Sequence, residues 1–395
     1  MRSAPSLAPP CRDVVVIGAG PAGSTTARRL AQCGHDVVVL EEHSVTGLPV
    51  HCTGLLGDEA FDEYDLPRHV ILGVASAARF WAGDGGSVLV ESDRVKATVI
   101  DRAAFDQELA RRAVVAGADV RTGVRVESMA VEGHQVVVQA LGETIRARAC
   151  VLACGANYRF HRSLGLGLPR AYMQSAQLET PFPRTSQIEV KFGRQVAPKG
   201  FAWLVPFFRN GEPHARLGLM CDADGRRHFD AFVQTLCADE RLDWRTLGSP
   251  RQKMLPLGPV SKTYAPRVLA VGDAAGLVKP ITGGGIYYGI ISGALAADVL
   301  HEGLRSDRLD QSALKGYEGQ WRKRLGPDIR VGLAFRRLAE RFDDRAINSV
   351  IELARVNGVV PLLKQTASFN WHRQAAVALL NHSGFRKILV RALCA

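Results

Sequence analysis

Residues 14–41 constrain the fold of this chain more than any other stretch. The segment opens with the apolar, β-branched run VVVI, which predicts a buried parallel strand, and it leads directly to Gly18, Gly20 and Gly23. A helical pattern follows the glycines, and a second apolar strand pattern ends at Glu41. A glycine-rich turn between strand and helix, with an acid closing the next strand, predicts a dinucleotide-binding fold.

Each residue type in this turn suits the binding of a nucleotide. Gly18 permits the tight turn, Gly20 lets the backbone approach a pyrophosphate, and Gly23 lets the helix pack closely on the strand. The helix N-terminus offers free N–H groups and a partial positive charge to phosphates, while Glu41 accepts hydrogen bonds from a ribose. A strand, a turn and a helix with unrelated glycines is the alternative. The expected cofactor-binding residues here are Gly18, Gly20, Pro21, Ala22, Gly23, Glu41 and Glu42.

Composition places the chain among globular proteins and gives no sign of a metal site. Its 395 residues suffice for two or three domains, with 47% hydrophobic and 23% charged residues. No apolar run is long enough to span a bilayer, and the first twelve residues lack the apolar core of a signal peptide, so we expect a cytoplasmic protein. The eight cysteines are scattered without metal-ligand spacing.

Positive charge is concentrated in the last quarter of the chain. The formal net charge is +11, and from His301 onward 17 Lys/Arg stand against 9 Asp/Glu, which gives +8. Such an excess suits lipid head groups or phosphorylated substrates, although a solvated basic face explains it equally well. We therefore expect either a helical cap or a peripheral membrane contact here, and no nucleic-acid partner, because no nucleic-acid motif is present.

The loop after Glu41 carries Gly47, Pro49, Cys52 and Gly54. This spacing resembles the G-x-P-x-x-C-x-G loop of the geranylgeranyl reductase family, FAD enzymes on the fold of para-hydroxybenzoate hydroxylase. The resemblance implies that Cys52 lies near the flavin, where it is a weak candidate for positioning or protonating a substrate. A buried, inert thiol is the alternative.

Two further segments resemble parts of the same superfamily that contact the cofactor. Asp101 predicts a helix cap, and Arg102 follows it in a DRxxFD-like segment whose arginine is implied to reach the phosphates of FAD. Residues 120–126 predict a strand, and Val126 at its end is implied to contact FAD. The segment ACGANYRF departs from the expected ADGxxS pattern, but Gly155 keeps the close backbone approach.

The second strong motif is GDAAGLVKPITGGGIYYG, which follows another apolar strand pattern. By resemblance Asp273 binds the ribityl chain of FAD, and the glycines open a helix whose N-terminus points at the pyrimidine end of the flavin. The dipole of such a helix favours the anionic reduced flavin. The residues implied here are Gly272, Asp273, Gly283, Gly284, Gly285 and Ile286.

An aromatic segment, APKGFAWLVPF, lies in a region of short alternating strands that predicts an antiparallel sheet. It resembles the glycine-aromatic-x-Trp-x-x-Pro segment of the family, so Phe201, Trp203 and Pro206, together with Pro280, are expected to bind substrate. Flat apolar side chains suit a hydrocarbon, which offers no hydrogen bonds. An aromatic strand of the core is the alternative.

The expected fold class is α/β, or α+β overall, in three parts. A Rossmann-like FAD-binding domain is expected from residues 11–68, 96–165 and 255–305, an antiparallel-sheet substrate domain from 69–95 and 166–254, and a C-terminal helical cap from 306–395.

The expected function is an FAD-dependent reductase that saturates C=C bonds of an isoprenoid, geranylgeranyl-type chain. An FAD-dependent monooxygenase or halogenase, and a non-catalytic nucleotide- or lipid-binding protein, are the alternatives. No second G-x-G-x-x-G turn is present, so NAD(P)H or another electron donor is expected to visit transiently. The sequence leaves open the head group of the substrate and the oligomeric state.

Overall fold

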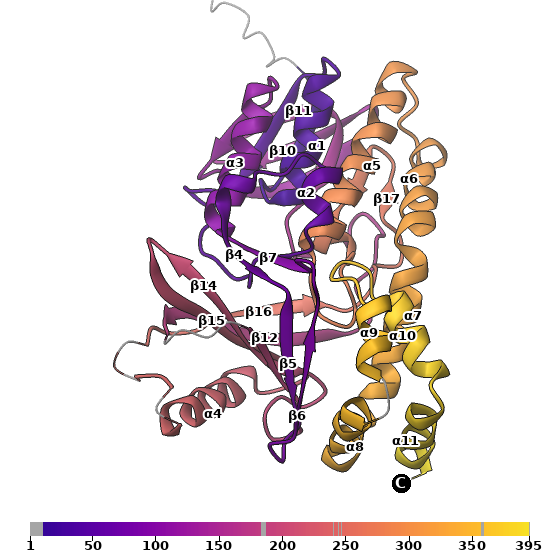
Figure 1. Ribbon diagram of the computed structural model, residues 1–395. Coiled ribbons are helices and arrows are strands. Elements are labelled where there is room, and N and C mark those ends of the chain that lie inside the picture. Colours follow the sequence, from indigo (N-terminus) through magenta and orange to yellow (C-terminus); the bar gives the residue numbers. More distant parts are fainter. Residues whose placement is uncertain are drawn as a thin grey trace, which may run out of the picture.

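The computed structural model describes residues 11–182, 187–239, 241–243, 245, 247–356 and 359–394. Figure 1 shows a mixed sheet with helices on its faces, a second sheet below it, and helices of the C-terminal part along one side. This arrangement confirms the expected α/β class with a Rossmann-like fold and a helical C-terminal region. The division of the chain into three domains at the residues given above stays a prediction.

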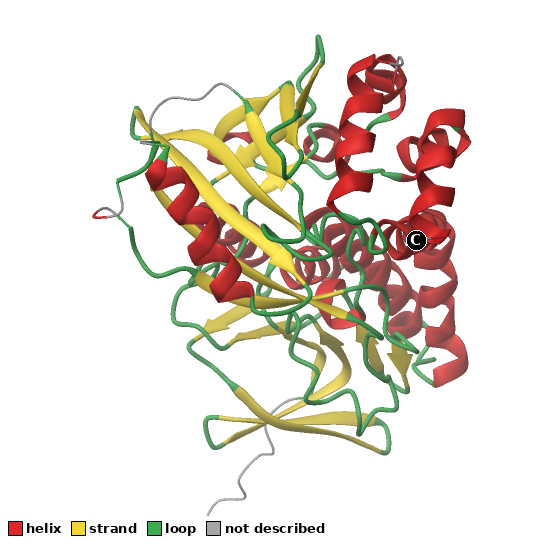
Figure 2. Ribbon diagram, turned by 90° about the horizontal axis from the view of Figure 1, so that it is seen from below, coloured by secondary structure: helices red, strands yellow, loops and turns green. Residues whose placement is uncertain are grey.

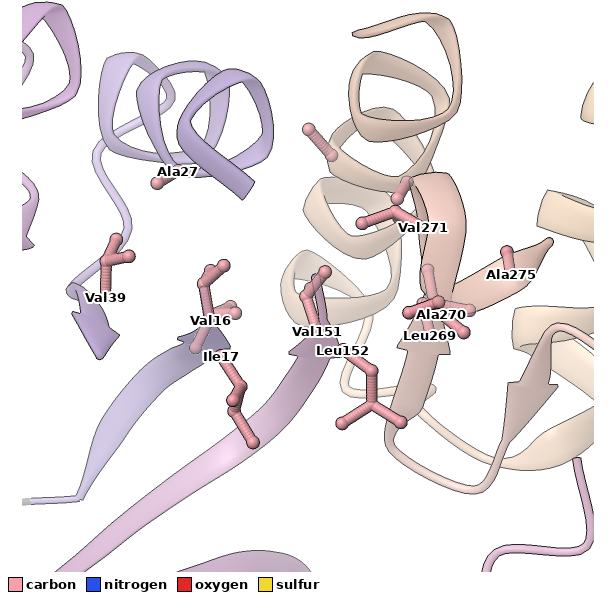
Figure 3. Close-up of a cluster of buried hydrophobic side chains, with 14 of the residues drawn as sticks. Val16, Ile17, Ala27, Val39, Val151, Leu152, Leu269, Ala270, Val271 and Ala275 are labelled. Atoms are coloured by element: carbon pink, nitrogen blue, oxygen red, sulfur yellow. The ribbon is translucent and has the colours of Figure 1, made fainter. Parts of the chain in front are cut away.

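The first sheet is built on β1, whose apolar residues are buried against a strand on each side. The described strands run in the order β17-β18-β11-β1-β2-β8, with parallel pairing from β18 to β8, and β10 and β9 extend the sheet from β11. The strands are β1 (Arg12–Ile17), β2 (Val37–Glu41), β8 (Asp119–Thr122), β9 (Val126–Glu132), β10 (Gln135–Ala140), β11 (Glu143–Leu152), β17 (Tyr264–Ala265) and β18 (Val268–Ala270). In Figure 3 the side chains of Val16, Val39 and Val151 lie in one apolar layer between the strands and the helices.

Three helices cover this sheet: α1 (Pro21–Gln32), α3 (Arg102–Val115) and α5 (Ile286–Arg305). Helices α1 and α5 approach closely because small residues meet at their contact. A Cβ added at Gly293 would lie 2.4 Å from the carbonyl oxygen of Ala22, and the Thr26 hydroxyl donates to the carbonyl of Gly293 at 3.0 Å. The helices that follow the two glycine-rich motifs are thereby packed side by side. The side chain of Asp101 accepts from the N–H groups of Ala103 and Ala104, which confirms the expected cap of α3.

One strand prediction was wrong. Residues 120–126 do not form a single strand, because Gly123 adopts a φ of +73° and ends β8 before β9 begins at Val126. A positive φ of this size breaks an extended strand and is accessible mainly to glycine.

The second sheet has the order β16-β12-β15-β14-β13-β5-β6 in the described residues. Its strands are β5 (Ala77–Trp81), β6 (Ser87–Glu91), β12 (Tyr172–Pro181), β13 (Ile188–Lys191), β14 (Phe201–Arg209), β15 (Glu212–Cys221) and β16 (Arg251–Pro256). The sheet is antiparallel as expected, except that β5 and β13 pair in parallel, because the β5–β6 hairpin joins from a distant part of the chain. Helix α4 (Gly225–Ala238) lies across one face of this sheet, as Figure 2 shows.

A small sheet joins the two larger ones. It consists of β3 (Leu55–Leu56), β4 (Ile71–Ala75) and β7 (Ala97–Ile100), with α2 (Glu59–Glu63) and the 3-10 turn η1 (Arg68–Val70) beside it. β4 lies against Phe207 of the second sheet, where a Cβ added at Gly73 would be 3.5 Å from the Phe207 side chain, an ordinary van der Waals contact.

The chain after residue 305 is mostly helical, as expected. The helices are α6 (Gln311–Arg324), α7 (Gly326–Ala339), α8 (Asp344–Val356), α9 (Val359–Thr366), α10 (Arg373–Asn381) and α11 (Ser383–Cys394). Ile351 and Val359 pack with Val88 of β6, so these helices rest on the far end of the second sheet. Within the described ranges no single helix is long and apolar enough to cross a membrane; α8 and α9 pass that test only together, bent by 87°.

Candidate active site

A large cavity lies where the two main sheets and the C-terminal helices meet. Its volume is about 1570 Å³. Most pockets for one small ligand measure roughly 300–1,000 Å³, so this cavity has room for a cofactor and a second molecule. One end is lined by the glycine-rich turns and the other by apolar side chains of β5, β6, β14 and the C-terminal helices.

The turn between β1 and α1 has the strained, tightly packed geometry that only glycine allows. Gly18 adopts a φ of +105°, and a Cβ added at Gly23 would lie 2.0 Å from the carbonyl oxygen of Gly18. Gly20 lines the cavity, and a Cβ there would meet nothing within 4 Å. The carboxylate of Glu41 accepts from the N–H of Ala19 at 2.9 Å, so the acid at the end of β2 also fixes the turn.

The next charged group in the cavity is Arg102, at the start of α3. Its guanidinium pairs with Asp106, and its Nε is buried without a hydrogen-bond partner in the described structure. Burial raises the pKa of Asp106 to about 6, although the charge of Arg102 opposes that shift. A buried N–H donor left unsatisfied at the cavity wall fits an anionic group, which supports the assignment of Arg102 to the phosphates of FAD.

The second glycine-rich motif lies on the same cavity, at the end of β18. The 3-10 turn η3 (Gly272–Ala275) places Asp273 at the wall, 3.6 Å from the ammonium of Lys253. Gly283 and Gly284 follow in a tight loop closed by two backbone hydrogen bonds with Lys279, of 2.8 and 3.0 Å. Gly285 is the N-cap of α5, so the positive end of that helix faces the cavity.

Cys52 is half-buried and lines the cavity. Its sulfur accepts from the N–H of Gly54 at 3.4 Å. Arg216, which is 1% exposed, holds this loop by donating to the carbonyl of Thr53 at 2.6 Å and to that of Ile100 at 2.9 Å. The thiol therefore has a fixed position beside the candidate flavin site.

The aromatic segment on β14 contributes two rings to the cavity. Phe201 and Trp203 lie with their ring centroids 5.8 Å apart, and Trp203 packs over Gly218, where a Cβ would come within 2.4 Å of the indole. Apolar residues from elsewhere continue this wall to the far end of the cavity. They include Phe80, Val88, Val90, Ile188, Val190, Phe192, Phe335, Phe342, Ile351, Leu363, Leu379 and Phe385.

Comparison with known proteins identifies the family. A family model described as pyridine nucleotide-disulphide oxidoreductase matches residues 12–177. A digeranylgeranylglycerophospholipid reductase of Methanoculleus marisnigri is 30% identical over 359 residues, 86% of this chain and 89% of that protein. The protein of the same name from Methanocaldococcus jannaschii is 28% identical over 361 residues, 86% of this chain and 90% of its own length. The chain belongs to the geranylgeranyl reductase family. It is an FAD-dependent oxidoreductase, as its motifs predicted.

Solved structures agree on the fold of this family member. A geranylgeranyl bacteriochlorophyll reductase-like protein from Thermoplasma acidophilum superimposes with a TM-score of 0.82 at 22% identity, covering 97% of this chain and 99% of that one. A flavin-dependent brominase superimposes with a TM-score of 0.71 at 15% identity, covering 97% of this chain and 99% of its own. At these identities the likeness shows the fold alone.

Most residues that the sequence assigned to the site of this reductase-family protein line the one cavity. Gly23, Pro206 and Pro280 do not line it: Gly23 packs against the turn, Pro206 lies further along β14, and Pro280 packs against Gly332 of α7. The individual assignments stay predictions. The residues brought together are Gly18, Gly20, Pro21, Ala22, Glu41, Glu42, Cys52, Arg102, Val126, Gly155, Phe201, Trp203, Gly272, Asp273, Gly283, Gly284, Gly285 and Ile286.

Lys279 and His372 are two of the polar residues in the cavity wall that sequence reasoning missed. Lys279 is 3% exposed and donates to the carbonyl of Phe369 at 2.9 Å. His372 contacts the same carbonyl at 3.1 Å, and burial, aided by the charge of Lys279, lowers its pKa to about 3, so it is neutral. The available signal was the single charge within the apolar run GLVKPI. His372 carried no such signal.

Proposed function

We propose that this protein saturates C=C bonds of a long isoprenoid chain, with hydride supplied by reduced FAD. One observation carries the proposal: the cavity that begins at the glycine-rich turns continues without a break into an apolar end beneath the C-terminal helices. The names of the relatives, digeranylgeranylglycerophospholipid reductases, support the same substrate class.

The apolar end suits a ligand that binds through area. A hydrocarbon chain makes no hydrogen bonds, so its affinity comes from burial at about 25 cal/mol per Å² of apolar surface. Phe80, Phe201 and Trp203 of the second sheet line this cavity together with Phe335 and Phe385 of the C-terminal helices. An unactivated alkene must be held in place and kept away from water to react. These walls serve both purposes.

Reduction of an alkene adds a hydride to one carbon and a proton to the other. The hydride would come from FAD held at the glycine-rich turns and reduced by NAD(P)H or another electron donor. Cys52 is the candidate that positions or protonates the alkene, since its thiol lies at the cavity wall. The chain thus contributes binding, orientation and the exclusion of water.

A first prediction tests the reaction directly. Protein reduced with dithionite and mixed without air with a geranylgeranyl lipid is expected to yield product heavier by whole hydrogen pairs, as read by mass spectrometry. Trp203→Ala should slow this step while FAD content is kept, because Trp203 lines the cavity from β14 and belongs to none of the glycine-rich turns. Phe208→Ala, an exposed side chain on the same strand, is the matched control and should react normally.

If the product gained oxygen in air and gained no hydrogen without air, the protein would be a monooxygenase and this proposal would be wrong. Incorporation of a halide into the product in air would indicate a halogenase. If Trp203→Ala lost FAD or unfolded, Trp203 would be a core residue and not a substrate-binding one.

We further propose that the basic C-terminal helices rest on an anionic lipid surface. Large apolar side chains are exposed on α8, α10 and α11, among them Val356 (75%), Val390 (59%) and Leu393 (41%). Exposed cations accompany them on α11, including Arg386, Lys387 and Arg391. Apolar side chains that insert and cations that attract head groups are the two parts of a peripheral contact.

A second prediction follows. The protein is expected to cosediment with vesicles rich in phosphatidylserine and much less with phosphatidylcholine vesicles. Binding should fall with salt, because cations near an anionic surface each contribute about 1 kcal/mol. Arg386→Glu combined with Lys387→Glu should weaken it strongly, whereas the same charge change at Lys315 and Lys323 of α6 should not. If both variants lost vesicle binding equally, net charge alone would explain the binding, and the proposal that α11 faces the membrane would be refuted.

A further inference from the structure

The cavity contains a buried cation without an anionic partner. Lys279 is 3% exposed, and its ammonium has only a carbonyl acceptor, from Phe369, whose ring centroid lies 4.2 Å away. Among the described residues no carboxylate lies within ion-pair distance of it. Buried lysines rarely lack an anionic partner, because a buried charge loses its hydration and an unpaired one gains no ion pair in return.

The ammonium lies at the mouth of the second glycine-rich loop. A Cβ added at Gly284 would be 2.6 Å from Cε and 3.1 Å from Nζ of Lys279. Gly285, the next residue, begins the N-terminus of α5. Two sources of positive potential, a whole charge and a helix end, therefore meet at one point of the cavity wall.

The C-terminal part of the chain holds the ammonium in this position. The loop 367–372 is docked on two earlier segments of the chain. Asn370, which is 0% exposed, accepts from the N–H of Gly57 at 3.3 Å, and Trp371 packs on Tyr287 of α5 with ring centroids 5.6 Å apart. The carbonyl of Phe369 is fixed by these contacts, so the Lys279 side chain is directed inward and cannot reach solvent.

We propose that Lys279 is the counter-charge for the two-electron-reduced form of FAD in this protein. Full reduction adds two electrons and one proton to the neutral flavin ring and leaves one negative charge at its pyrimidine end. That end is expected at Gly283–Gly285, beside the ammonium. A fixed cation in a buried site stabilises the negative charge that appears there, without any reorganisation of water.

When the flavin is oxidised and therefore neutral, it provides no negative charge to balance the ammonium of Lys279. Burial lowers the pKa of Lys279 to about 7. The groups that face it from neighbouring elements are Glu59 of α2 and Cys52, both of which raise its pKa, the neutral His372, and Arg336 of α7, which donates to the next carbonyl along the chain. A negative charge on the flavin raises the pKa of Lys279. Above about pH 7, reduction must therefore draw a second proton into the protein.

The test is the reduction potential of bound FAD, measured by absorbance with dithionite and a reference dye from pH 6 to pH 9. In Lys279→Met at pH 6 the ratio of reduced to oxidised FAD at a fixed potential is expected to fall about tenfold, which is about 30 mV for a two-electron couple. Lys279→Arg, which keeps the cation, should restore much of that ratio. Lys262→Met is the matched control, since this lysine also lies over a ring, Tyr264, but outside the cavity. Its potential should not change.

The wild-type protein alone provides a second readout. Proton uptake per two electrons should rise from one toward two above pH 7, and this rise should be missing in Lys279→Met. A rise in proton uptake that persists in Lys279→Met overturns the proposal, as does an unchanged potential in Lys279→Met at pH 6. No alkene is present in these measurements, so the outcome is independent of the proposed substrate.

Discussion

Alanine at position 23, in the first glycine-rich turn, is expected to destabilise the protein strongly. The new Cβ would lie 2.0 Å from the carbonyl oxygen of Gly18 and 3.0 Å from the Cβ of Ala153. The Gly18 carbonyl belongs to the backbone of the turn, and Ala153 directly follows the buried strand β11, so neither can move without shifting the main chain. We expect the free energy of unfolding to fall by about 3 kcal/mol or more, seen as a lower melting temperature of the FAD-free protein.

Gly20→Ala is the matched control, because it adds the same methyl group two residues from Gly18 in open space. A Cβ at Gly20 meets no protein atom within 4 Å and points into the cavity. The FAD-free variant should therefore melt like the wild type, whereas its affinity for FAD should fall. Equal melting temperatures for Gly23→Ala and the wild type would contradict the close packing of this turn.

The second large effect is expected at Arg216. Its guanidinium is buried, donates to the carbonyls of Thr53 and Ile100, and pairs with Glu179 at 3.0 Å. Arg216→Met keeps most of the volume but leaves two carbonyls and a carboxylate without this partner. We expect a loss of about 3 kcal/mol in stability and a weaker affinity for FAD, since the loop of Cys52 is no longer anchored.

The pH dependence of that loss has a definite sign. Burial alone would raise the pKa of Glu179, but hydrogen bonds from Arg209 and the charge of Arg216 lower it below its ordinary value. A carboxyl whose pKa is lowered by folding stabilises the protein above about pH 4.3, and this contribution disappears as the pH falls through the lowered pKa. The difference in stability between Arg216→Met and the wild type should therefore shrink in acid.

Chemical denaturation at pH 7 and pH 3 measures both effects. Arg322→Met is the control, because Arg322 is half exposed and pairs with Glu318 within one helix at 2.9 Å. Such exposed pairs contribute roughly 0.3–0.5 kcal/mol, so this variant should change little at either pH. A denaturation curve for Arg216→Met at pH 7 that matches the wild type would mean that Arg216 does not anchor the loop.

The sequence by itself determined the local geometry of the cofactor end. The Gly18–Gly23 turn, the Asp101 cap and the strand at β1 depend on backbone conformations and hydrogen bonds between residues close in the chain. Such features leave a local pattern of glycines, caps and apolar runs. Because parallel strands end at one edge of a sheet, the motifs that follow β1 and β18 could also be placed together.

Only the tertiary structure decided the rest of the cavity. The parallel pairing of β5 with β13, the helices after residue 305 that close the apolar end, and the contact of Lys279 with Phe369, 90 residues away, have no signature in either segment alone. Each depends on which apolar faces fit together when distant parts of the chain are buried, and periodicity records that a face is apolar, not what it meets.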